Sequence, residues 1–209
     1  MEQIVQLNSN AKLSEHFTLG EMTKSSSHPE VYNIPSHEAI ANLKRVCTWL
    51  EVLRKRYNER YNACHLDQAQ RVERSLDYAR DDRRGDGRDD KGGGTLGMTT
   101  APVSSRLSEA HGEISEKPII INSGYRSPQL NRKIGGVKNS NHLTGCAVDI
   151  RVTGMEQAKQ YAEILREYAD ESHQDFDELL IEKNRYGAIW LHFAVRPREN
   201  RRRILYINA

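Results

Sequence analysis

Residues Ser140–Asp149 read SNHLTGCAVD, and the interpretation of the whole chain starts from them. They place an imidazole, His142, and a carboxylate, Asp149, seven positions apart with a glycine between them. The small and apolar residues around Asp149 indicate a buried strand over residues 147–152, which would hold this carboxylate in a fixed direction. The loop before the strand can bring His142 back to the same point, so the two side chains are candidate ligands of one metal ion.

A third ligand is needed for such a site, and His192 is the best candidate. It stands alone as an ionisable residue in the run Ile189–Val195, IWLHFAV, which has the apolar character of a strand. The sequence therefore predicts a metal site made of His142, Asp149 and His192.

Composition limits the classes of protein that fit. The 209 residues suit one domain, and 31 basic against 29 acidic residues leave a net charge of +2, which gives no reason to expect a nucleic-acid partner. The three cysteines show no metal-binding or disulfide spacing, so we expect reduced thiols. There is no signal-peptide pattern and no apolar run long enough for membrane insertion, so we expect cytoplasmic synthesis of a soluble chain. We also expect the chain to be a monomer.

One segment differs from the rest in composition. An amphipathic helix is expected over residues 36–61, and residues 63–116 then become dense in alternating charge before a triple glycine at 92–94. Such a segment buries too little apolar surface to offset its ordering entropy, so we expect a helical extension followed by a mobile loop. We interpret the chain as a single domain over residues 1–209 with a charged insertion at 63–116.

The remaining pattern predicts an α+β fold. A second amphipathic helix is expected from residue 154 to 169, and β-branched or apolar runs predict strands at 117–123, 147–152, 176–182, 188–195 and 203–207. These elements would form a small antiparallel or mixed sheet with helices packed on one face.

Arg126 follows the first of these strands, in the stretch Gly124–Pro128, just upstream of the proposed metal loop. Its planar guanidinium suits a substrate carboxylate or a developing oxyanion better than a lysine would. A structural role, in which Arg126 pairs with an acid or with loop carbonyls, explains the same residue.

Three motifs, at residues 123–127, 140–149 and 190–192, together resemble those of a known family. Ser140, His142, Gly145, Ala147 and Asp149 match the SxHxxGxAxD pattern of peptidase family M15, the zinc D-Ala-D-Ala carboxypeptidases and phage endolysins, most closely its small single-domain branch. The stretch 123–127 resembles the arginine motif of that family, and residues 190–192 resemble the strand that carries its last histidine. The likeness covers residues 13–60 and 117–207.

The resemblance implies a Hedgehog/D,D-peptidase-like fold and a zinc ion (Zn2+) held by His142, Asp149 and His192. It implies that Arg126 anchors the substrate or stabilises the oxyanion. The substrate would be a D-amino-acid-containing peptidoglycan stem peptide or muropeptide, hydrolysed through a zinc-activated water, with action at the cell wall.

The general base does not carry over from the family. Many relatives have an acidic residue three positions before the last ligand, where this chain has Ile189. Glu182, at the end of the neighbouring strand, is the first candidate because a hairpin can bring it close to His192. Asp177 is the second candidate, and an exposed carboxylate without a catalytic role explains Glu182 equally well.

Three hypotheses therefore remain open at this point. The first is a zinc metallopeptidase of the carboxypeptidase or endolysin type. The second is a catalytically weak or inactive zinc-containing module that binds peptidoglycan, and the third is a structural or phage-assembly protein in which the three ligands are only packed polar residues.

Overall fold

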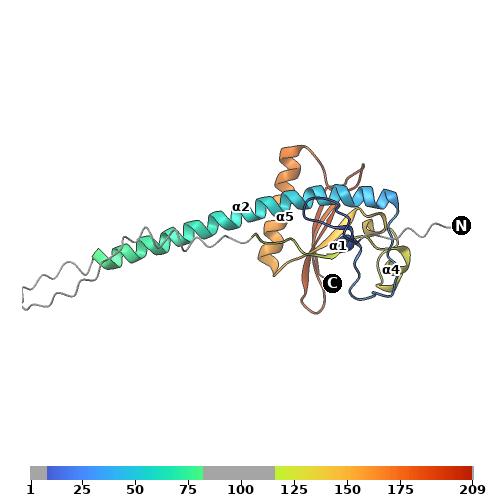
Figure 1. The fold of residues 1–209 in the computed structure, drawn as a ribbon, viewed down its shortest axis with the longest axis horizontal. Helices are drawn as coiled ribbons and strands as arrows, with labels where there is room; N and C mark the ends of the chain where they lie inside the picture. The colour runs from blue at the N-terminus through green and yellow to red at the C-terminus, as the bar shows by residue number, and fades with distance from the viewer. Residues whose placement is uncertain (1–8, 82–115, 209) are drawn as a thin grey trace, which may run out of the picture. The chain divides into compact units, whose positions relative to one another are not determined.

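The computed structural model describes residues 9–81 and 116–208, coloured in chain order in Figure 1. The chain forms two compact units: one contains the residues up to Tyr57 and from Pro118 onward, and the other is Asn58–Lys117. The expected mobile loop and the triple glycine at 92–94 lie outside the described residues. The insertion with bounds 63–116 stays a prediction.

The elements follow one another along the chain as five helices and five strands within the described residues. They are α1 (Leu19–Thr23), α2 (His37–Asp81), β1 (Ile121–Ser123), α4 (Pro128–Lys133), the 3-10 helix η2 (Asn141–Thr144), β2 (Ala147–Arg151), α5 (Met155–Ser172), β3 (Glu178–Lys183), β4 (Ile189–Ala194) and β5 (Arg203–Asn208).

The strands of the described residues form one sheet in the order β1-β2-β4-β3-β5. Neighbouring strands are antiparallel except β3 and β5, which run parallel. A mixed sheet accompanied by helices confirms the predicted α+β class. The β3–β4 connection is the expected hairpin, in which Gly187 takes a positive φ of 87° that glycine adopts without steric cost.

The two faces of the sheet differ in character because side chains alternate along each strand. One face carries apolar residues such as Val148, Leu179 and Phe193, and these pack against helices α2 and α5 in the hydrophobic core. Trp49 of α2 lies 5.3 Å from the ring of Phe193, measured between centroids. The opposite face carries Asp149 of β2, Glu178 and Glu182 of β3 and His192 of β4, so the core side supports the sheet while the other side is available for chemistry.

Two elements differ most in length from the sequence prediction. β1 has three residues rather than seven, because only Ile121–Ser123 pair with β2 and the pairing register shifts within them. α2 continues beyond residue 61 to Asp81, as the expected helical extension. Within the second unit, the side chain of Asn58 accepts a hydrogen bond from the backbone N–H of Lys117 at 2.7 Å and donates one to its carbonyl at 3.1 Å. Asn58 and Lys117 are thus linked by two hydrogen bonds.

No helix in the described part of the chain is long and apolar enough to cross a membrane.

Candidate metal centre

Strand pairing brings two of the predicted ligands together. Asp149 of β2 lies directly opposite His192 of β4 in the antiparallel ladder, so both side chains leave the same face of the sheet. His142 comes from η2, the short helix immediately before β2. All three side chains are buried, and they form a group that could hold a metal ion.

The three ligand atoms have the spacing of a metal site. His142 Nε2 lies 3.3 Å from His192 Nδ1 and 3.3 Å from Asp149 Oδ1, and His192 Nδ1 lies 2.9 Å from the same Oδ1. Bonds of about 2.0–2.1 Å in tetrahedral geometry place neighbouring ligand atoms about 3.3 Å apart. The residues present therefore fit a tetrahedral ion with little movement, and three protein ligands leave one position for water or substrate.

Local structure fixes the direction of His142. Its backbone N–H is bound by the Ser140 hydroxyl at the start of η2, and its Nδ1 lies 2.6 Å from the carbonyl oxygen of Gly124. A proton on Nδ1 donated to this carbonyl leaves the lone pair of Nε2 for a metal. Burial lowers the pKa of His142, against an opposing effect of Asp149, which favours the neutral form that metals require.

Two glycines in the motifs are required by the packing around this histidine. Gly145 ends η2 with a φ of 72°, and a Cβ at this position would lie 2.5 Å from the carbonyl oxygen of Ala39 in α2. At Gly124 a Cβ would lie 2.4 Å from the carbonyl oxygen of Met22. Both contacts are too short for any side chain, so glycine lets the loop approach the neighbouring backbone.

Glu178 of β3 lies beside His192, the third candidate ligand. Its Oε2 lies 3.6 Å from His192 Nε2, while Nδ1 of the same ring faces the metal position. A carboxylate behind a metal-binding histidine fixes the ring and raises its basicity. Burial alone would lower the pKa of His192, but the hydrogen bond with Asp149 and the nearby carboxylate of Glu178 outweigh burial and raise this pKa to about 9. The sequence prediction did not include Glu178. Its spacing of four residues from Glu182 in one strand places both carboxylates on the same face, and this spacing could have indicated it.

Arg126 pairs with the acidic ligand. Its Nη2 donates to Asp149 Oδ2, the oxygen that does not face the histidines, and its Nε donates to the Ser123 hydroxyl at 2.8 Å. This is the pairing with an acid that the sequence left open as an alternative, yet Arg126 also lines the cleft above the ligands. Burial would raise the pKa of Asp149, but the two imidazoles outweigh it and hold the pKa well below its ordinary value.

The ligands lie in a cleft of about 420 Å³ on the open face of the sheet, which is also lined by Glu178, Glu182 and Trp190. In the β3–β4 ladder Glu182 lies opposite Trp190, which is two positions before His192 in the chain. Burial raises the pKa of Glu182 above its ordinary value, which makes its carboxylate a stronger base.

Asp177 is in a different situation. Its fully buried carboxylate accepts hydrogen bonds from Nε and Nη2 of Arg201, at 2.8 and 2.7 Å, and from Asn141. Although burial raises the pKa of Asp177, these hydrogen bonds dominate and lower it. The geometry gives Asp177 a structural bond to Arg201, and Glu182 remains the first candidate for a base.

Comparison with known proteins supports the resemblance. Residues 92–183 match the family model described as Peptidase M15. The curated protein "Zinc D-Ala-D-Ala carboxypeptidase" from Streptomyces albus G is 33% identical over 66 residues, which cover 29% of this chain and 26% of that protein. The resemblance to peptidase family M15 is thereby confirmed. The matched range includes Arg126, His142 and Asp149, ends before His192, and begins inside the segment that the sequence motifs left out.

Proposed function

We propose that this relative of the M15 peptidases is a zinc metallopeptidase that hydrolyses D-amino-acid-containing stem peptides of peptidoglycan. The observation that carries the proposal is the triangle of His142 Nε2, Asp149 Oδ1 and His192 Nδ1, with sides of 2.9–3.3 Å, at the bottom of an open cleft. The substrate class comes from the name of the Streptomyces relative, of which this chain matches about a quarter.

Two histidines and one carboxylate are the donor set of many hydrolytic zinc sites. When bound there, zinc would supply an acidified water and a positive charge that polarises the scissile carbonyl. The protein itself prepares the donors: Gly124 and Glu178 set the two histidine rings, and Arg126 holds the outer oxygen of Asp149.

Glu182 would act as the general base. It lines the cleft next to the ligands, and its raised pKa suits the uptake of a proton from the attacking water. The same carboxylic acid can then deliver that proton to the leaving amine. Glu182 of β3, which lies opposite Trp190, would thus take the place of the acid that many relatives carry three residues before the last histidine.

Arg126 would bind the substrate oxygen. A guanidinium has five N–H donors, and the contacts with Asp149 and Ser123 leave others to face the cleft. Because the Asp149 contact fixes the side chain before substrate arrives, its positive charge is already aligned for a developing oxyanion.

The test is digestion of purified muropeptides by the zinc-loaded full chain, with products identified by mass spectrometry. Wild type should release cleaved stem peptides, and Glu182→Gln should keep its zinc while turnover falls by about 10²–10⁴-fold. Glu163→Gln, on the exposed side of α5, is the matched control and should leave turnover unchanged.

A second function is favoured by Ile189, which occupies the usual position of the base. If zinc and muropeptides bind but no product forms, the chain is an inactive peptidoglycan-binding module. If neither zinc nor muropeptide binds, both functions are wrong.

A further inference from the structure

We infer that the cleft accepts a peptide that continues on both sides of the scissile bond, so that the protein acts as an endopeptidase rather than as a carboxypeptidase. This inference rests on the proposed peptidase function and adds the class of substrate. It is carried by the cavities that adjoin the metal centre and by the charges that line them.

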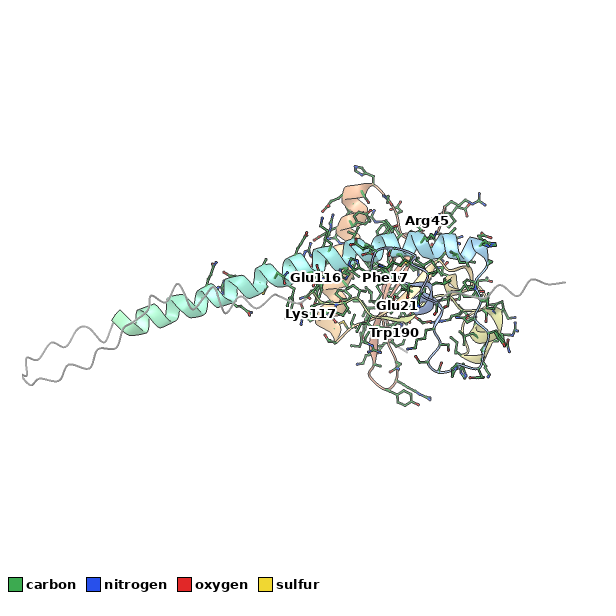
Figure 2. The ribbon with its side chains drawn as sticks, viewed as in Figure 1. Phe17, Glu21, Arg45, Glu116, Lys117 and Trp190 are labelled. Carbon is green, nitrogen blue, oxygen red and sulfur yellow. The ribbon has the colours of Figure 1, made fainter. Side chains whose placement is uncertain are left out.

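The first adjoining cavity lies beyond Arg126 and Trp190. These two side chains line the central cleft and also a second cavity of about 580 Å³, whose far side is formed by the loop Lys24–Ser27. Trp190, labelled in Figure 2, is only half-buried, so its indole is available as an apolar surface along which a peptide can pass. Serine hydroxyls at the far side can bind peptide groups of either polarity.

The second adjoining cavity lies beyond η2. It measures about 460 Å³ and shares Asn139, Asn141 and Arg201 with the central cleft. Its remaining lining includes Lys138 and Arg196, and no acidic side chain of the described residues lines it. Arg201 and Arg196 both pair with Asp177, so Lys138 provides the positive charge that no ion pair among the described residues engages. An occupant on this side is therefore expected to carry a carboxylate.

The three ligands line the central cleft and neither of the two others. The reacting bond would thus lie in the central cleft, and each of the two adjoining cavities is at least as large as that cleft. A carboxypeptidase has to recognise a chain end about one residue, roughly 3.5 Å, beyond the bond that it cuts. The central cleft alone is large enough for such an end, since cavities of about 300–1,000 Å³ hold small ligands. Two further cavities indicate a longer substrate.

The experiment compares two substrates with the same scissile D-alanyl bond. One is a free stem pentapeptide that ends in D-Ala-D-Ala, and the other is a cross-linked stem-peptide dimer that continues beyond the bond. With the zinc form of the full chain, kcat/KM for the dimer should exceed that for the pentapeptide by at least about tenfold. Equal or faster cleavage of the pentapeptide overturns the inference and leaves the proposed peptidase function standing.

Variants test the two cavities separately. Ser26→Trp fills the first cavity and Lys138→Trp fills the second; both residues are exposed and neither lines the central cleft, so the fold should tolerate the larger side chain. Each should lower kcat/KM for the dimer by about tenfold or more. Gln160→Trp on α5 adds the same side chain to the helical side of the sheet and is the matched control. If neither cavity-filling variant changes kcat/KM for the dimer, the inference is contradicted.

Loss of the proposed function would look different, because neither substrate would then be cleaved. In that case calorimetric titration of both peptides into the zinc form tests peptide binding to the two adjoining cavities, independently of catalysis. The inference is supported if the dimer binds more tightly than the pentapeptide and if either cavity-filling tryptophan variant weakens that binding. Equal binding of both peptides overturns it.

Discussion

Replacing Gly145 by alanine tests whether the metal loop depends on its approach to helix α2. Gly145 has a φ of 72°, and a Cβ there would lie 2.5 Å from the carbonyl oxygen of Ala39. Gly135 is a natural control because it has nearly the same φ, 74°, with nothing within 4 Å of the added Cβ. The two alanine variants share the conformational cost and differ in the clash.

The magnitudes follow from these two terms. Alanine in the left-handed region costs about 1–2 kcal/mol at either glycine. At Gly145 the overlap of about 1 Å with a fixed backbone oxygen adds about 1–3 kcal/mol, the usual range for overpacking. We therefore expect Gly145→Ala to reduce the free energy of unfolding by about 2–5 kcal/mol in total.

Chemical denaturation of both variants measures this difference, and thermal melts should separate them by about 2–12 °C. A second readout is zinc affinity, because Gly145 lies between His142 and Asp149 in the chain and Gly135 does not. Only Gly145→Ala should bind zinc more weakly. Equal destabilisation by the two variants would refute the close approach to Ala39.

Two further predictions concern carboxylates. Glu178→Gln should weaken zinc binding by about 10–100-fold in a competition titration, because His192 loses its charged partner; unchanged affinity would reject that role. Glu51 accepts hydrogen bonds from Ser14 and from the backbone of His16, and although burial raises its pKa, these bonds lower it below the ordinary 4.5. Its stabilisation is then complete above pH 4.5 and is lost as pH falls through the lower folded pKa. Glu51→Gln should thus cost about 1 kcal/mol at pH 7 in urea unfolding, and the difference from wild type should vanish in acid; a constant difference would contradict the assignment.

The candidate ligands could be identified from the sequence because each of them stands in a motif with a local structural reason. Asp149 and His192 stand in apolar runs that are typical of buried strands, and a polar residue there needs a partner. The α+β class followed from the alternation of helical and strand periods. These signals are local and do not depend on which strands become neighbours.

The residues behind the ligands could not be found in the same way. Glu178 acquires its role only when β3 pairs with β4, and Arg126 reaches Asp149 only when the loop after β1 folds over β2. Such contacts depend on strand register, which a single sequence leaves open. For the same reason the sequence offered both Glu182 and Asp177 as candidate bases; in the structure Glu182 lies opposite Trp190, and Arg201 pairs with Asp177.

We propose that His142, Asp149 and His192 together hold one zinc ion. Native mass spectrometry of the full chain, first freed of metal and then supplied with zinc, tests it directly. We predict one zinc per chain, and loss of that ion in His142→Ala and in Asp149→Ala, with both variants still folded by circular dichroism. A folded wild-type chain that stays metal-free, or alanine variants that keep the ion, would contradict the account.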